Sequence, residues 1–161
     1  MDPNMDPITY KGCVYPWQCD QIGHMNIMWY VGKFDEANWN HLARVGLTPS
    51  YLRTEERGMA AVQQNITYKR ELLAGEIVEI RSRFLEVRDK ALRFVHEMRN
   101  AETGEVAAIC EITAVHIDRR APSEMPRMLR SRPGWLRTES SRQTLAGAAL
   151  RCESVGQCHE A

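Results

Sequence analysis

The fold is decided by one stretch and the residues that follow it: Cys19-Asp20-Gln21-Ile22-Gly23-His24-Met25-Asn26. After this stretch, mostly apolar residues recur at three- and four-residue spacing, at Ile27, Tyr30, Val31, Phe34, Ala37, His41, Leu42 and Val45. This periodicity predicts one long helix with a single buried stripe. Residues 8–17, ahead of the stretch, read as a strand. Asp20 therefore lies in the connection between a strand and a long helix.

Beyond the helix the period of the apolar residues changes from helical to alternating. Gly46 is a suitable cap for a helix that ends at Val45, and Thr48-Pro49 starts a short helical turn. From Gly58 onward, apolar and polar residues alternate, which predicts two half-buried strands, followed by two further strands in one antiparallel meander. The last strand is apolar on both faces and is expected to be central. The predicted class is α+β, with an antiparallel sheet of about five strands and one long helix.

The composition predicts one domain and limits the partners. A chain of 161 residues that is 43% hydrophobic can form one proper core. Twenty-one basic residues balance twenty-one acidic ones, so no net charge attracts nucleic acid or a membrane. No apolar run reaches membrane-spanning length, and the N-terminus lacks the pattern of a signal peptide. We expect a soluble cytoplasmic protein without nucleic-acid or membrane partners.

The domain is expected to span residues 1–130, with a short helix near residues 122–130 and a loose polar tail at 131–161. The five cysteines are odd in number and match no paired metal-ligand spacing. We therefore expect reduced thiols and no metal site. Because one helix can cover only one face of the sheet, the other face needs a partner, and a homodimer is the simplest solution.

The connection ahead of the helix carries candidate catalytic groups. The Asp20 carboxylate can act as a base or a nucleophile, and the first amides of the helix, near Met25, Asn26 and Ile27, can polarise a thioester carbonyl. Gly23 allows close approach of the chain, and His24 can orient the substrate or donate to its carbonyl. This arrangement is suited to hydrolysing an ester or thioester.

Each residue alone has a structural interpretation. An aspartate ahead of a helix is most often a turn or cap residue, Gly23 is a turn residue and Asn26 is an N-cap. A histidine beside aromatic residues is more often structural than catalytic. The combination of residues is what points to chemistry.

Together, Asp20, Gly23, His24, Asn26, Tyr30 and Ala37 resemble the motif of the hot-dog fold acyl-CoA thioesterases of the 4-hydroxybenzoyl-CoA thioesterase type. The layout is similar over residues 8–117, and the motif itself covers residues 20–37. Ile27 departs from the family pattern, which commonly has a second asparagine there. The resemblance implies a hot-dog fold, in which a sheet wraps around the long helix.

The resemblance also implies how the chain works. Asp20, His24 and Asn26 are the implied catalytic residues, and Gly23, Met25, Ile27 and Tyr30 line the substrate site. Active sites of this family lie at a dimer interface, so Gln64 and Asn65 are candidates to reach the site from a second subunit of a homodimer or homotetramer. No cofactor is implied beyond the coenzyme A of the substrate.

Two other groups of residues have possible roles in binding. Some of eight basic residues are candidates for the phosphates of coenzyme A: Lys69, Arg70, Arg81, Arg83, Arg88, Lys90, Arg119 and Arg120. Three tryptophans flank the motif: Trp17, Trp29 and Trp39. They could form a cage for a quaternary ammonium acyl group, form a slot for an aromatic acyl group, or serve in ordinary packing.

The leading hypothesis is an acyl-CoA thioesterase without metal or redox cofactor. A hydratase or dehydratase on the same fold is a second hypothesis, although those enzymes space their aspartate and histidine differently. A non-catalytic module that binds or senses acyl-CoA is the third. Release of free thiol distinguishes the first hypothesis from the others.

Overall fold

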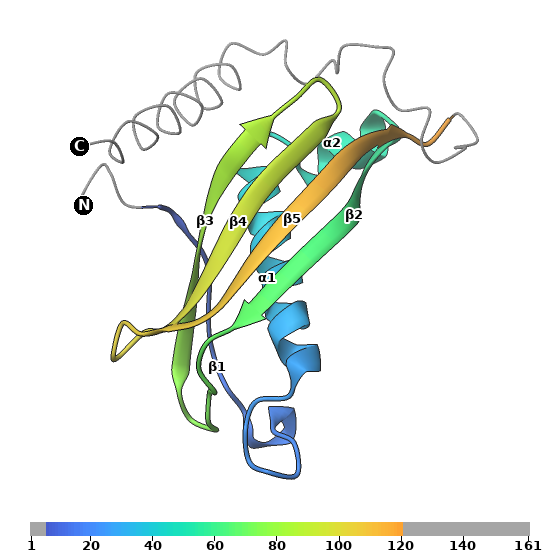
Figure 1. Cartoon of the computed structure of the whole chain (residues 1–161). Coiled ribbons are helices and arrows are strands. Elements are labelled where there is room, and N and C mark those ends of the chain that lie inside the picture. The colour runs from blue at the N-terminus through green and yellow to red at the C-terminus, as the bar shows by residue number, and fades with distance from the viewer. Residues whose placement is uncertain (1–5, 121–161) are drawn as a thin grey trace, which may run out of the picture. The chain divides into compact units, whose positions relative to one another are not determined.

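The computed structural model describes residues 6–120. Its elements are, in chain order, β1 (Ile8–Cys13), the 3-10 turn η1 (Pro16–Gln18), α1 (Ile27–Ala43), α2 (Pro49–Thr54), β2 (Arg57–Tyr68), β3 (Ile77–Val87), β4 (Ala91–Asn100) and β5 (Val106–Asp118) (Figure 1). The predicted helix at residues 122–130 and tail at 131–161 lie outside the described residues. The α+β class is confirmed.

The predicted boundaries are right for most elements and wrong for the first strand. We expected a strand over residues 8–17, but β1 ends at Cys13 and a 3-10 turn begins at Pro16. Proline has no N–H to donate to a sheet, and its fixed φ suits the start of a helical turn. The Gln18 side chain accepts a hydrogen bond from Tyr15 N at 3.1 Å and closes this turn. As predicted, the long helix begins at Ile27, and Thr48 caps α2 by accepting from Tyr51 N.

The five strands form one sheet in the order β1-β3-β4-β5-β2. The predicted meander is confirmed for β3, β4 and β5, and β5 is an inner strand as expected. The predicted position of β2 is wrong, because β2 lies beside β5 at the sheet edge instead of beside β3. Alternation of apolar residues determines which face of a strand is buried, but not which strand lies next to it. The connection from β2 leads across the sheet to β3, which lies between β1 and β4, and Lys69 N and Arg70 N donate to Ala107 O along the way.

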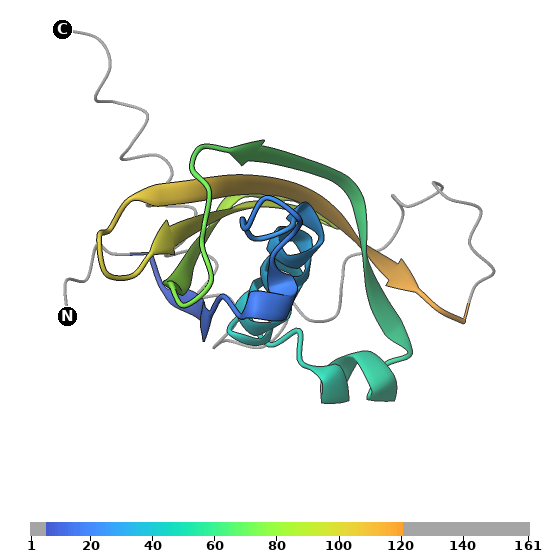
Figure 2. The same cartoon turned by 90° about the horizontal axis from the view of Figure 1, so that it is seen from below.

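The described residues divide into two compact units. The first contains residues 6–41, 65–83 and 95–111, and the second contains residues 42–64, 84–94 and 112–120. In the first unit, α1 lies against one face of the strands (Figure 2). Phe34 and Ala37 of its apolar stripe are fully buried, and the Phe34 ring stacks on the His96 ring of β4 at a centroid distance of 6.1 Å.

A chain of buried polar groups lies in the core of the first unit. Thr9 Oγ1 and Ser82 Oγ are 2.6 Å apart, and Ser82 Oγ is 2.5 Å from His96 Nδ1. All three side chains are buried. Burial lowers the pKa of His96 to about 4, because desolvation penalises the charged imidazolium. The imidazole is therefore neutral at physiological pH.

In the second unit, the end of β5 contacts the start of β2 and the residue that precedes it. Arg57 pairs with Asp118, Arg120 pairs with Glu56 at 2.8 Å, and Arg119 N donates to Glu56 O. His116 of β5 is buried, and its ring faces that of Tyr51. Desolvation, together with the nearby charge of Arg57, lowers the pKa of His116 to about 4.

Strand β2 is more exposed than its alternating pattern predicts. We expected one buried face, but Val62 and Tyr68 are 48% and 46% exposed. The prediction of a half-buried strand is therefore wrong for β2 in a single chain. Because β2 is an edge strand, one of its sides pairs with no other strand of residues 6–120.

Candidate active site

Residues 19–25 form a closed loop directly ahead of α1. Cys19 and Met25 pair as an isolated antiparallel bridge, and Asp20 N donates to His24 O at 2.9 Å. Gly23 N donates back to Asp20 O at 3.1 Å, and Gly23 has a φ of 85°, which side chains rarely tolerate. The structural interpretation of Gly23 as a turn residue is confirmed, and its role in close approach at the substrate site stays a prediction.

The Asp20 side chain fits both a structural and a catalytic role. Its Oδ1 accepts hydrogen bonds from Ile22 N at 3.0 Å and from His24 N at 3.4 Å. Within residues 6–120, Oδ2 accepts no hydrogen bond. The side chain is exposed and lines an open pocket with Cys19, Gln21 and Asn26. One carboxylate oxygen thus orients the group, while the other is available for chemistry.

The amides at the start of α1 differ from the prediction. Met25 N donates to Leu72 O at 2.7 Å, and Asn26 N donates to Gln18 O at 2.8 Å. The expectation that these two amides are free is therefore wrong, because carbonyls from other parts of the chain occupy them. Ile27 N has no partner among the described residues, and the Ile27 side chain is 63% exposed. It is the one predicted oxyanion donor that keeps a free N–H.

Asn26 acts as the cap of the helix. Its Oδ1 accepts from Met28 N at 3.0 Å, and its backbone carbonyl accepts from Trp29 N at 2.9 Å. An N-cap takes up one of the first amides of a helix and fixes the direction in which the others point. Asn26 also lines the Asp20 pocket, so the cap and the pocket share this residue.

His24 lies against a segment that the motif does not contain. Its Nδ1 is 3.5 Å from Glu71 Oε2, and its backbone forms an isolated bridge with Leu73. We did not predict Glu71 as a site residue. Its position between two predicted strands carries no local signal, since only the tertiary fold brings it beside the loop.

Tyr30 is buried one turn into α1. Its hydroxyl donates to Arg70 O at 3.3 Å, and its ring meets that of Tyr68 edge-on at a centroid distance of 5.2 Å. Desolvation raises the pKa of Tyr30 to about 12, so the phenol keeps its proton at physiological pH. Tyr30 thus holds the chain after β2 against the start of α1.

Other predicted site residues are not brought to the pocket within one chain. Gln64 and Asn65 are exposed on β2, and neither lines the Asp20 pocket. Their role from a second subunit stays a prediction. Trp17 is 68% exposed and stacks on Tyr15 at 4.4 Å, and within the described residues no ring contact joins two of the three indoles.

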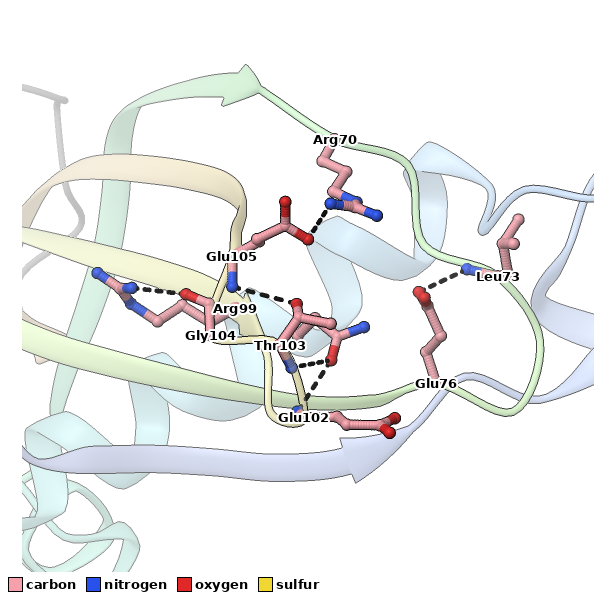
Figure 3. A network of polar contacts seen from close by, with 9 residues as sticks. Arg70, Leu73, Glu76, Arg99, Glu102, Thr103, Gly104 and Glu105 are labelled. Carbon is pink, nitrogen blue, oxygen red and sulfur yellow. Dashed lines mark hydrogen bonds and ion pairs between the residues drawn. The ribbon is translucent and has the colours of Figure 1, made fainter.

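The eight candidate phosphate ligands differ in whether they form an ion pair with a carboxylate. Five arginines are paired with carboxylates: Arg70 with Glu105, Arg81 with Glu79, Arg83 with Asp6, Arg88 with Glu86 and Arg120 with Glu56. Figure 3 shows the Arg70 pair beside the turn between β4 and β5. Across residues 6–120, Lys69, Lys90 and Arg119 make no ion pair. Lys69 directly precedes the segment that lies along the Asp20 loop.

Residues 6–120 contain neither a cluster of metal ligands nor a membrane-spanning helix. No group of three or more histidine, cysteine, aspartate or glutamate side chains is placed to hold a metal ion. No helix there is long and apolar enough to cross a membrane. Within the same residues, Cys13, Cys19 and Cys110 form no disulfide.

Comparisons with known proteins agree with this geometry. Residues 14–132 match the model of the thioesterase-like superfamily. An L-carnitine dehydrogenase/betainyl-CoA thioesterase from Agrobacterium fabrum is 31% identical over 102 residues, which are 63% of this chain and 21% of that protein. A betainyl-CoA thioesterase from Pseudomonas aeruginosa is 24% identical over 118 residues, which are 73% of this chain and 74% of that protein. The chain thus spans about a fifth of the first relative and about three quarters of the second.

The fold is also shared with solved structures. A hypothetical protein from Staphylococcus aureus in complex with CoA superposes with a TM-score of 0.74 at 16% identity, covering 91% of this chain and 87% of that one. At this identity the likeness shows the fold alone. The family match covers most of the chain, including the Asp20 loop, α1 and strands β2 to β5. The chain belongs to the thioesterase-like superfamily.

Proposed function

We propose that this protein hydrolyses an acyl-CoA thioester to the free acid and CoA, with Asp20 and Ile27 N–H as its reacting and stabilising groups. The observation that carries the proposal is the position of the two groups. Asp20 lies near the start of the loop of residues 19–25, and Ile27 begins α1 just after that loop. Asp20 lines an open pocket with Oδ2 uncommitted, and Ile27 N is the free amide at the positive end of α1. A base or nucleophile beside an oxyanion donor is what acyl transfer to water requires.

The chemistry at this site has two possible first steps. In one, Asp20 takes a proton from water, whose oxygen attacks the thioester carbon. In the other, Asp20 attacks directly to form a mixed anhydride, which water then hydrolyses. In both, the carbonyl electrons move to oxygen and are stabilised by Ile27 N–H. Collapse breaks the C–S bond, and the CoA thiolate leaves and takes up a proton.

His24 and Lys69 are assigned to substrate binding. The His24 backbone N–H helps to fix Asp20, and we propose that its ring orients the substrate. Lys69 is exposed, makes no ion pair within the described residues and lies next to Arg70 and Glu71 in the chain, which suits it to a phosphate of CoA. The S. aureus neighbour that holds CoA supports a substrate of this kind.

We also propose that two copies of the chain pair through β2. Residues 58–68 contain no charged side chain and no proline, although 26% of the chain is charged. Long, flat and uncharged edge strands are rarely left open to water. Pairing would cover Val62 and Tyr68 and give Gln64 and Asn65 a role across a two-fold interface.

The test of the function is release of free thiol from a panel of acyl-CoAs: short, long, aromatic and betainyl. The names of both curated relatives make betainyl-CoA the first substrate to assay. Turnover of any member supports the proposal and identifies the acyl class. Binding of acyl-CoA without thiol release would contradict it and favour a sensing module, and addition of water to an enoyl-CoA would favour a hydratase.

Ile27→Pro is expected to lower kcat by about 10² to 10³-fold, because it removes the proposed oxyanion donor. Proline is tolerated at the first position of a helix, where no helical hydrogen bond is lost, so the helical circular dichroism signal should persist. Ile27→Ala is the matched control, since it shortens the same exposed side chain and keeps the N–H. Equal kcat values for the two variants would argue against this amide as the oxyanion donor.

Val62→Lys is expected to convert a dimer to a monomer, because the substitution places a charge on each side of a two-fold strand pairing. Light scattering coupled to size-exclusion chromatography measures the mass directly. Thr54→Lys on α2 adds the same charge at an exposed site away from β2 and should leave the mass unchanged. A wild-type protein that is already monomeric, or a Val62→Lys variant with wild-type mass, would rule out pairing through β2.

A further inference from the structure

We propose that Glu71 is a positioning residue for hydrolysis, which acts by fixing the imidazole of His24 through its Nδ1. The proposal rests on the acyl-CoA thioesterase function and assigns a second carboxylate to its site. Glu71 Oε2 is 3.5 Å from His24 Nδ1, and this pair joins the loop of residues 19–25 to the connection between β2 and β3. Glu71 lies outside the sequence motif of residues 20–37.

The backbone places the two residues side by side. Met25 N donates to Leu72 O at 2.7 Å, and His24 and Leu73 form an antiparallel bridge. Residues 71–73 therefore run alongside residues 24–25 as a short two-stranded contact. This contact places Glu71 within reach of His24.

The segment that carries Glu71 is fixed on both sides. On one side, Arg70 O accepts from the buried Tyr30 hydroxyl, and the Arg70 side chain pairs with Glu105. On the other side, Glu76 Oε2 accepts from Leu73 N at 2.9 Å, as Figure 3 shows. The segment can thus act as a rigid support for the loop.

A carboxylate at Nδ1 determines what the other ring nitrogen can do. It favours the tautomer with the proton on Nδ1, which leaves Nε2 as a hydrogen-bond acceptor. Nδ1 then points at Glu71, so the ring has one orientation and presents Nε2 elsewhere. The same residue donates its backbone N–H to Asp20 Oδ1, which links the ring orientation to the loop that holds the carboxylate.

The kinetic test compares three variants of Glu71. The Glu71 side chain is 62% exposed, so water weakens the pair, and we expect Glu71→Ala to lower kcat about tenfold with little change in KM. Glu71→Asp should recover part of the rate, and Glu71→Gln should keep the orientation but not the charge. Glu102→Gln, which removes an exposed carboxylate from the turn between β4 and β5, is the control and should match wild type.

A double-mutant cycle separates positioning from a purely structural role. If Glu71 acts through the ring, Glu71→Ala should lower kcat in wild type but not in the His24→Asn background. A tenfold loss in both backgrounds, or a loss explained by a lower melting temperature, would overturn the proposal.

A spectroscopic readout does not depend on activity. With nitrogen-15 labelled histidine, and the His24 signals assigned from the His24→Asn variant, the neutral ring should carry its proton on Nδ1 in wild type and shift toward Nε2 in Glu71→Ala. An unchanged tautomer would refute the proposal even in an active enzyme. A tautomer that depends on Glu71 in a protein that cleaves no acyl-CoA would instead uphold the pair and refute the thioesterase function.

Discussion

Asp20→Asn is expected to lower kcat for acyl-CoA hydrolysis by about 10² to 10⁴-fold, the usual contribution of a general base. The asparagine carbonyl can still accept hydrogen bonds from Ile22 N and His24 N, so the loop should keep its shape. What the variant loses is a group that can take a proton from water or attack the thioester. The measurement is thiol release under saturating substrate, with the melting temperature recorded for each protein.

Asp35→Asn is the matched control for this prediction. Asp35 is an exposed carboxylate on α1, close to Asp20 in the sequence, and it does not line the pocket. Its substitution removes the same charge and should change kcat less than twofold. An Asp20→Asn enzyme with a wild-type rate would remove Asp20 from the mechanism, whatever the substrate.

The second large effect is a loss of stability in mild acid. His96 has a pKa of about 4 in the folded protein, against 6.5 for an ordinary histidine. Between these values the unfolded chain binds more protons than the folded one, so the free energy of unfolding falls as the pH drops below about 6.5 and levels off near pH 4. A shift of this size corresponds to about 3 kcal/mol. His116, whose pKa is also about 4, adds a loss in the same direction.

Urea unfolding between pH 7.5 and pH 4.5 measures this loss. His96→Asn keeps an acceptor near the position of Nδ1 for Ser82 but cannot be protonated, so the variant should lose less stability on acidification than wild type. The comparison is between the pH slopes, because the substitution also changes the packing at neutral pH. If the His96→Asn slope equals that of wild type, His96 is not a source of the acid sensitivity.

The sequence motif predicted the local parts of the site correctly. The glycine at position 23, the cap at Asn26 and the start of α1 at Ile27 were all predictable, because each depends on the conformation of neighbouring residues only. Which amides of the helix lack a hydrogen-bond partner could not be predicted in the same way. Whether Met25 N is free depends on Leu72 O, which lies far along the chain, and no pattern in residues 19–27 can reveal such a partner.

The position of β2 was missed for a related reason. The alternation in residues 58–68 correctly predicted a strand, since a period of two reflects the geometry of a single extended chain. It could not show that β2 lies beside β5 at an edge, because the choice of neighbour depends on pairing with residues near 107 and on the connection that follows. The exposure of Val62 follows from that edge position.

By itself, the sequence determined that this chain is an α+β domain in which an aspartate precedes a long buried helix, and that it resembles a family of thioester hydrolases. Those conclusions rest on local periodicity and on a motif of residues close together in the chain. Only the tertiary structure decided which amide of the helix remains free, which strand forms the sheet edge and that Glu71 faces His24. Each of these depends on contacts between distant segments, which packing and hydrogen bonding establish only when the whole chain folds.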